Sequence, residues 1–302
     1  MAKQLTTSPA STTKKHSILR WIVTVSLITT LCGTILGTWV LTTTPGLQWF
    51  LSTTSSISSG DYKFSGVSGT FSAIKIQSIH ITNEDKHFKL TEFAFDWQPS
   101  ALFSKQLIVK QLSAREVEIL TPPSAEPLSL PEHIRLPLSI SIKNIEIDSL
   151  SLFSNKEEKA DFSASNLKAA LESDGQQHHL PHLSLNSEFG SFHASAKLEG
   201  NKPFNLSAQA NLVGLTEIAA TALSETRIDA VINGNLSQLN LSITATGDAL
   251  NGDGDILIQP FASFPVGALR LSVDGFNPQQ FSPETPKADL LLSINLQQNH
   301  ES

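Results

Sequence analysis

The sequence predicts a mostly β protein in which a single N-terminal transmembrane helix is followed by an elongated, curled antiparallel β-sheet. Three observations support this prediction. One long uncharged apolar segment lies near the N-terminus. Almost everything after it alternates apolar and polar residues with a period of two, which is typical of strands with one dry and one wet face. Turn-forming residues separate these runs, so we expect about fifteen strands between residues 62 and 297.

The apolar segment is long enough to cross a membrane once. Residues 21–41 contain no charged side chain, and at about 1.5 Å per residue they span about 30 Å, the thickness of a bilayer core. Trp21 lies at one end of the expected anchor, and Trp39 and Leu41 lie at the other; indole rings favour the membrane interface. A cleaved signal peptide is the alternative, but the segment is long for one and residues 42–45 form no small-residue cleavage site.

Charge predicts the orientation of this anchor. Residues 1–20 hold Lys3, Lys14, Lys15 and Arg20 and no acid, and the positive-inside rule places them in the cytoplasm. The expected organisation is therefore a basic tail at residues 1–20, an anchor at 21–42, a polar tether at 43–60 and an exported β segment at 61–302.

The exported part excludes several classes of function. The net charge of −7 becomes −11 once the basic tail is set aside, and nucleic-acid binding needs clustered Lys and Arg instead. The only cysteine, Cys32, lies within the anchor, so we expect neither an intrachain disulfide nor a cysteine zinc site. No phosphate-binding glycine loop, nucleophile elbow or paired carboxylates with a histidine partner occur, so we expect no enzyme and no cofactor.

Two polar clusters contain residue types that bind metals, but we expect no metal at either. His178, His179 and His182 lack a carboxylate neighbour and are expected in a polar turn. The second cluster departs from the EF-hand spacing and is expected to be a hairpin turn. It comprises Asp248, Asn251, Asp253 and Asp255.

Three segments depart from simple alternation. Between residues 138 and 152 the apolar phase slips by one at residues 143–144 and again at 148–149, which predicts bulges or bends that curl the sheet. The prolines of residues 121–137 cannot join a ladder, so we expect a surface loop there. Residues 215–223 are expected to form a short helix.

The apolar positions of the strands define one dry face. On the residues alone, this face either packs as the core of a closed sandwich or lines an open groove. Alanines leave space at several of these positions, but both possibilities stay open. The candidate residues are Ile140, Ile142, Phe192, Ala194, Ala196, Leu198, Leu206, Ala208, Ala210, Leu239, Leu241, Ile243, Leu290, Leu292 and Ile294.

Several segments together resemble the TamB family of the AsmA-like group. They are residues 43–49 after the anchor, then 66–74, 90–119 and 276–281, and the resemblance of order and spacing covers residues 17–302. Family members are several times longer. The chain is therefore expected to be an N-terminal portion, incomplete at its C-terminus.

The resemblance implies a taco-like, open β-groove that is anchored in the bacterial inner membrane and extends into the periplasm. It implies a bridge that contacts phospholipid acyl chains, conducts phospholipid toward the outer membrane, and serves outer-membrane protein assembly with a TamA-like partner. The apolar positions named above would then be lipid contacts. The alternative is a scaffold or chaperone that guides outer-membrane strands by β-augmentation at its edges.

Overall fold

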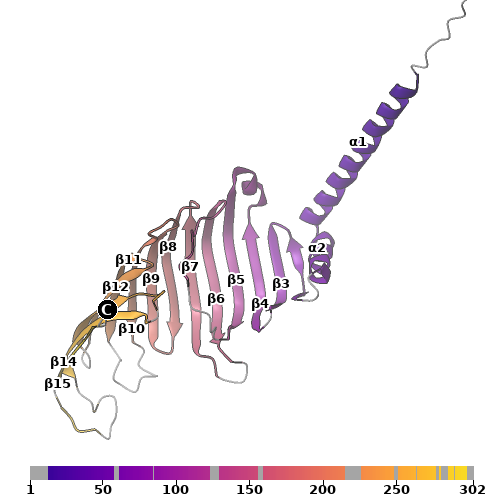
Figure 1. Cartoon of the computed structure of the whole chain (residues 1–302). Helices are drawn as coiled ribbons and strands as arrows, with labels where there is room; N and C mark the ends of the chain where they lie inside the picture. Colours follow the sequence, from indigo (N-terminus) through magenta and orange to yellow (C-terminus); the bar gives the residue numbers. More distant parts are fainter. Residues whose placement is uncertain are drawn as a thin grey trace, which may run out of the picture.

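The computed structural model describes residues 13–57, 61–83, 85–122, 129–155, 159–214, 226–247, 251–262, 264–276, 279, 285–288 and 290–297, with side chains in the first helix from Ser26 onward. These residues form two N-terminal helices and one 15-stranded sheet (Figure 1). The expected mostly β fold is confirmed. The short helix expected at residues 215–223, Asp248, Lys3 and the side chains of Lys14, Lys15, Arg20 and Trp21 lie outside the described part.

Helix α1 (Thr13–Thr42) and helix α2 (Thr44–Ile57) meet at a sharp bend. Within the described residues, no single helix passes as a membrane span by length and hydropathy, whereas Ser26–Thr42 and Thr44–Ser56 pass together across a bend of 97°. Glycine at position 46 permits this tight bend, because a Cβ atom there would collide with the carbonyl oxygen of Trp39. The expected transmembrane helix therefore stays a prediction.

Helix α2 occupies most of the segment that was expected to be a polar tether. Several of its hydroxyl groups donate to carbonyls of the preceding turn, as from Thr53 to Trp49 (2.8 Å), whereas Thr44 donates to the Gly69 carbonyl (2.8 Å) and Ser55 to the Tyr62 carbonyl. Leu47 is fully buried, and Gln48 Nε2 donates to the Val67 carbonyl (2.8 Å). These contacts order a Ser- and Thr-rich stretch whose composition alone indicates a linker.

The strands follow one another across the sheet in chain order, except that β2 pairs only with β3. Their bounds are β1 Tyr62–Ser65, β2 Ser68–Thr70, β3 Ala73–Asn83, β4 Lys86–Trp97, β5 Gln106–Leu120, β6 Ser139–Phe153, β7 Phe162–Ser173, β8 Gln177–Ser187, β9 Gly190–Glu199, β10 Asn205–Val213, β11 Arg227–Asn235, β12 Gln238–Thr246, β13 Asn251–Ile258, β14 Val266–Phe276 and β15 Leu290–Gln297. A 3-10 turn, η1 (Pro99–Ser104), joins β4 to β5.

The expectation that all neighbouring strands are antiparallel is wrong at one pair. Strands β5 and β6 run parallel, whereas the other pairs of the described sheet are antiparallel. The connection between Leu120 and Ser139 is long enough to return the chain to the end where β5 began, which a parallel crossover requires. Its described prolines lie outside the strands, as expected.

The phase slips expected in β6 coincide with local distortions of the sheet. The register between β6 and β7 shifts between Ile142 and Ile145, at the first slip, which confirms a bulge there. At the second slip, Asn166 of β7 lies between the partners of Ile147 and Ser149 and has a φ of 53°. Asn tolerates this left-handed conformation better than most residues. The side chains of β7 can therefore change faces at this position while the strand stays paired with β6.

The two polar clusters lie in strands instead of the expected turns. The histidines of residues 178–182 belong to β8, and the turn before them is made by Asp174, whose carboxylate accepts N–H groups of Gln176 (2.8 Å) and Gln177 (2.7 Å). These two hydrogen bonds lower the pKa of the Asp174 carboxyl, and the bond from Gln177 has the larger effect. Asn251, Asp253 and Asp255 belong to β13.

The sheet is a single layer with little enclosed core. In the described part, the substantial contacts join neighbours in the sheet, the two helices, and α2 with β1 and β2. The large apolar side chains that are fully buried are Leu47, Val109 and Phe204. Strands β1 and β15 do not pair with each other, so the sheet stays open, and Figure 1 shows it curling along its length.

Candidate functional site: the apolar face

A row of register partners crosses every strand from β3 to β15, and each member is apolar or glycine. Facing partners on neighbouring strands point to the same side of a sheet, so this row forms one continuous apolar band, the central row. Its members are Ile74, Phe95, Leu112, Ile145, Ala169, Leu183, Ala194, Ala210, Ala230, Ile243, Gly254, Leu271 and Ile294.

Two further rows flank the central row from β8 to β15, and together the three rows define the apolar face. One row is Leu185, Phe192, Leu212, Ile228, Ala245, Gly252, Val273 and Leu292. The other is Leu180, Ala196, Ala208, Ile232, Leu241, Ile256, Leu269 and Leu296. No polar side chain enters any of the three rows.

The opposite face of the sheet carries mainly polar side chains, with apolar exceptions such as Val231 and Leu257, and some of the polar groups bond to one another. Asn211 donates to Asp229 (2.9 Å) and Ser242 donates to Asp255 (2.8 Å) across neighbouring strands. The hydrogen bond from Arg227 lowers the pKa of the Asp229 carboxyl, so this group stays ionised at neutral pH. The three rows of the apolar face, in contrast, contain no polar side chain.

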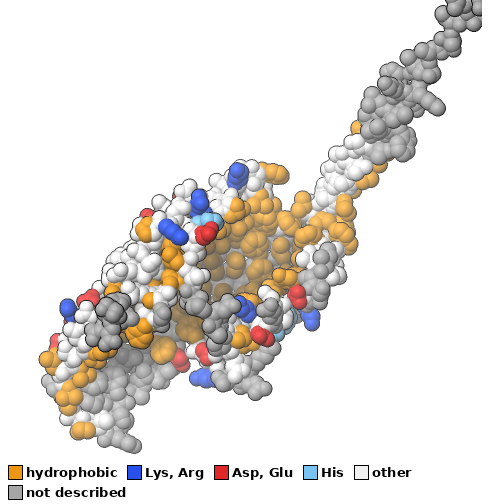
Figure 2. All heavy atoms as spheres, in the orientation of Figure 1, with side chains coloured by type: hydrophobic (Ala, Val, Ile, Leu, Met, Phe, Trp, Pro, Cys, Tyr) orange, Lys and Arg blue, Asp and Glu red, His pale blue; other side chains and the backbone are white. Residues whose placement is uncertain are grey.

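The apolar face is not covered by any described element. Most of its side chains are half-buried between their neighbours on the same face, and those on β15 are exposed, as for Ile294 (41%). Figure 2 shows a hollow with a hydrophobic floor over the strands nearer the helices, with charged side chains at its margin. This is an open apolar surface with room for a ligand.

One polar site lies beside the apolar face, at Ser173 and His178. His178 Nε2 lies 2.7 Å from the Ile134 carbonyl oxygen, which can only accept, so Nε2 carries the proton. The Ser173 hydroxyl then donates to His178 Nδ1 (2.9 Å) and accepts from Gly175 N–H (3.0 Å). These bonds fasten the β5–β6 connection to the ends of the strands on the apolar side.

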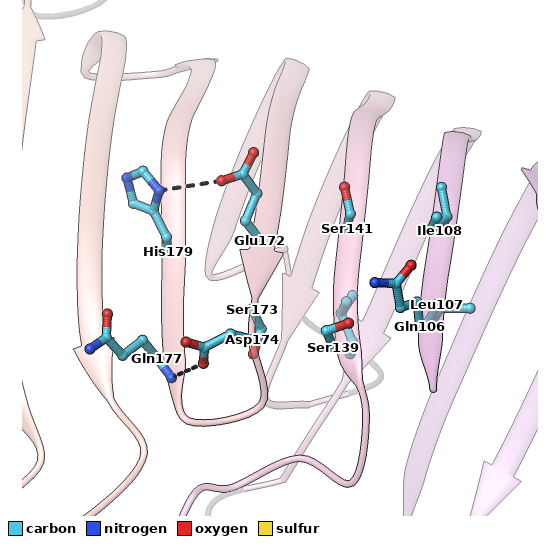
Figure 3. Close-up of a pocket in the computed structure, with 11 residues that line it drawn as sticks. Gln106, Leu107, Ile108, Ser139, Ser141, Glu172, Ser173, Asp174, Gln177 and His179 are labelled. Atoms are coloured by element: carbon cyan, nitrogen blue, oxygen red, sulfur yellow. Dashed lines mark hydrogen bonds and ion pairs between the residues drawn. The ribbon is translucent and has the colours of Figure 1, made fainter. Parts of the chain in front are cut away.

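A cavity of about 420 Å³ lies mainly on the polar side, at the ends of β5 to β8 (Figure 3). Ile108, Ser141, Glu172 and His179 line it as register partners. Among these residues, His179 Nδ1 lies 3.7 Å from Glu172 Oε2. In the described part of the chain, no three His, Cys, Asp or Glu side chains gather as metal ligands would.

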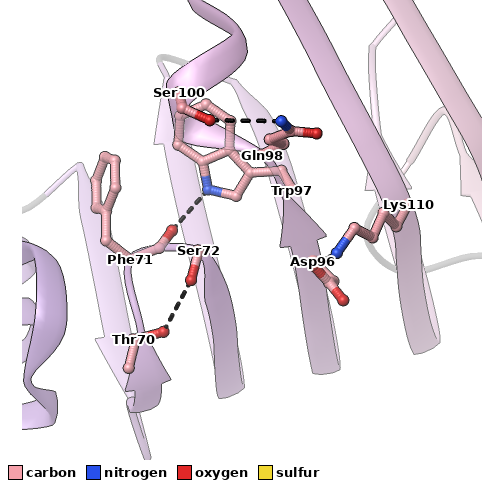
Figure 4. A network of polar contacts seen from close by, with 8 residues as sticks. All are labelled: Thr70, Phe71, Ser72, Asp96, Trp97, Gln98, Ser100 and Lys110. Carbon is pink, nitrogen blue, oxygen red and sulfur yellow. Dashed lines mark hydrogen bonds and ion pairs between the residues drawn. The ribbon is translucent and has the colours of Figure 1, made fainter.

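Aromatic rings connect the helices to the apolar side of β4. The ring centroids of Phe50 and Phe71 lie 6.4 Å apart, those of Phe71 and Trp97 5.3 Å, and those of Trp97 and Phe95 5.9 Å. Trp97 is buried, and its indole N–H donates to the Phe71 carbonyl (2.6 Å), as Figure 4 shows. Phe93 continues the series beside Phe95, at 6.2 Å.

A family model described as the N-terminal domain of TamB matches residues 31–129 and 120–260. These matches cover well over half of the chain. The chain belongs to the TamB family. The resemblance inferred from the sequence is thus confirmed, and the part matched to TamB contains the central row as far as Gly254. Comparisons with curated proteins and with solved structures find no match.

Membership of the TamB family sets the context for the apolar face. TamB proteins are anchored in the inner membrane, partner with TamA in outer-membrane assembly, and form a bridge and assembly module, not a known enzyme family.

The fifteen residues predicted from the sequence all lie on the apolar side of this TamB domain. Most of them belong to the three rows. Ile140, Leu198, Leu206 and Leu239 share a further row that also contains Ser173, His178 and Gly234. Ile142 and Leu290 alternate with such residues on their own strands, which puts them on the same side.

Sequence reasoning missed the part of the apolar face nearest the helices. Ile74, Phe95 and Leu112 of the central row lie on β3, β4 and β5. The signal was present, because Phe93, Phe95 and Trp97 alternate with polar or small residues as clearly as the residues that were chosen. The resemblance to TamB drew attention to this block without assigning its apolar positions to the groove.

Proposed function

We propose that this chain is the anchored, periplasmic part of a bridge that conducts phospholipid along its apolar face from the inner toward the outer membrane. The proposal rests on the unbroken central row, because a path for acyl chains must stay apolar at every strand it crosses. Phospholipid acyl chains are the ligand, and a TamA-like protein of the outer membrane is the partner. Through that partner, the bridge serves outer-membrane protein assembly.

The chemistry of the face suits acyl chains. Each methylene group removed from water contributes about 0.8 kcal/mol, so an uncovered apolar band binds lipid tails without any specific contact. Small residues such as Ala194, Ala210 and Ala230 leave space above the strands for a tail to lie on. The open side of the curled sheet lets a polar headgroup remain in water.

The N-terminal helices supply the attachment that this function needs. The uncharged stretch of residues 21–41 crosses the inner membrane once, and the basic residues before it hold the N-terminus in the cytoplasm. The sheet then lies in the periplasm. Helix α2 follows directly and packs on β1 and β2, so the apolar face begins close to the membrane.

A second candidate function is supported by the free edge of the sheet. Within the described residues, β15 pairs only with β14, and its outer edge is open to another strand. A scaffold for outer-membrane strands would use this edge by β-augmentation. Such a function needs the backbone of β15 and does not need the continuous apolar band.

The substitution Ile243→Glu in the full chain separates these functions. Ile243 is half-buried on the central row, and a carboxylate there reaches water at the open side, so we expect a folded, β-rich protein with normal circular dichroism. The phospholipid that co-purifies with the protein, measured by mass spectrometry, should fall several-fold.

The matched control is Ser242→Glu on the polar face of the same strand, which should retain as much phospholipid as the wild type. Aggregation of the Ile243→Glu protein would mean that this position is a packed core. Unchanged phospholipid, together with binding of an extended peptide at the edge of β15, would favour the scaffold instead.

A further inference from the structure

The turn between β4 and β5 carries two large apolar side chains at its tip. Phe103 is 95% exposed and Leu102 is 43% exposed. Lys105 follows them and is also exposed. Single exposed apolar residues are ordinary on a protein surface, but two adjacent ones beside a lysine form a small amphipathic tip.

This tip is held in place by its own hydrogen bonds. Ala101 is buried, and its N–H donates to the Gln98 carbonyl (3.1 Å). The N–H of Lys105 donates to the Leu102 carbonyl (2.9 Å), and the Lys105 carbonyl accepts from Ser139 N–H (3.0 Å). The exposure of Phe103 is therefore a property of a well-ordered turn.

The tip lies at the same end of the strands as the end of α1. The Phe71 N–H donates to the Leu41 carbonyl of α1 (3.3 Å), and Trp97 donates to the Phe71 carbonyl (2.6 Å). Phe103 follows Trp97 by six residues, which reach at most about 20 Å even when fully extended. Figure 1 shows the β4–β5 turn rising at the end of the sheet nearer to α1.

We propose that the β4–β5 tip is a second contact with the bilayer that holds α1. Leu102 and Phe103 enter the boundary between headgroups and acyl chains, and the Lys105 ammonium group lies near the lipid phosphates, an arrangement typical of interfacial segments. This proposal rests on the proposed function, because it requires α1 to cross a membrane.

The two contacts together would orient the groove. Trp39 and Trp49 are exposed where α1 meets α2, and the tip lies beyond β4 at the same end of the strands. Between them lie Phe71 and Trp97, from which aromatic rings lead to the central row at Phe95. The end of the apolar face at β3 and β4 would thus be held against the membrane surface, where acyl chains can enter.

The test places an environment-sensitive fluorophore at position 103 of the full chain in phosphatidylethanolamine and phosphatidylglycerol liposomes. Cys32→Ser removes the native thiol, and Phe103→Cys, at an almost fully exposed site, provides the attachment point. Lipids with a spin label on the acyl chain should quench this fluorophore at least threefold more than a fluorophore at Phe189→Cys. Phe189 is 54% exposed in the β8–β9 turn, at the opposite end of the strands.

A fluorophore at Trp39→Cys distinguishes the two ways in which the test can fail. Strong quenching at position 39 with equal, weak quenching at 103 and 189 would overturn the second contact and leave the anchor intact. Absence of quenching at position 39 would overturn the anchor itself, and the tip proposal with it.

Discussion

At the scale of single residues, Trp97 joins the helices to the sheet. Its ring lies between those of Phe71 and Phe95, its side chain is buried, and its indole N–H donates to a backbone carbonyl (2.6 Å). That carbonyl belongs to Phe71, whose own N–H reaches the Leu41 carbonyl at the end of α1. One side chain therefore supports both the first strands and their connection to α1.

Replacement of Trp97 by Phe keeps most of the packing and removes the hydrogen bond. The Phe71 carbonyl loses a partner, so we expect the free energy of unfolding in detergent to fall by about 1–2 kcal/mol. Trp49→Phe, at an exposed position of α2, should change it by less than about 0.5 kcal/mol. Equal losses for both variants would contradict the role assigned to Trp97.

Residue-level patterns predicted the faces of the strands well. A period of two identifies which side chains share a face, and every candidate chosen in this way lies on one side of the sheet. The pattern could not show which residues of different strands stand opposite one another, because register depends on turns and bulges such as that between Ile142 and Ile145. The continuous rows are therefore visible only in the structure.

At the scale of secondary-structure elements, the parallel pairing of β5 and β6 was the main difference from the sequence-based expectation. The alternation of apolar and polar residues along a strand does not depend on the direction of its neighbour, so the apolar residues of β6 fit a parallel or an antiparallel neighbour equally well. The alternation of apolar and polar residues shifts by one position in both strands, and it does so at matching places. Leu112 is paired with Ile145 before the shift, and Val117 is paired with Leu150 after it. Helix α2 was missed for a different reason, because tertiary contacts order its polar residues.

Cysteine pairs test the direction of β5 against β6 in a Cys32→Ser background. Leu107 and Ile140 are register partners in the parallel arrangement, so the double variant Leu107→Cys with Ile140→Cys should form a disulfide under mild oxidation. The pair Leu107→Cys with Leu152→Cys should stay reduced, because Leu152 lies at the far end of β6. The reverse result, measured by mass spectrometry of proteolytic fragments, would restore the antiparallel meander.

At the scale of the whole molecule, the described strands form one open, curled layer, and no described element covers its apolar side. Composition and alternation predicted a sheet with one dry face but left open whether that face closes on itself. The structure shows that β1 and β15 do not meet and that no described element packs over the face. Strands stack about 4.8 Å apart, so the path from β3 to β15 is on the order of 60 Å long.

Photo-crosslinking along this path tests most directly the claim that the apolar face carries phospholipid. A benzophenone amino acid placed in the full chain at Phe95, Ala194 or Ile243 samples the central row near the helices, in the middle and toward the last strands. We expect phospholipid adducts at all three positions and none above background at His193 or Ser242 on the polar face. Adducts that are absent from the central row, or equally abundant on both faces, would contradict the account.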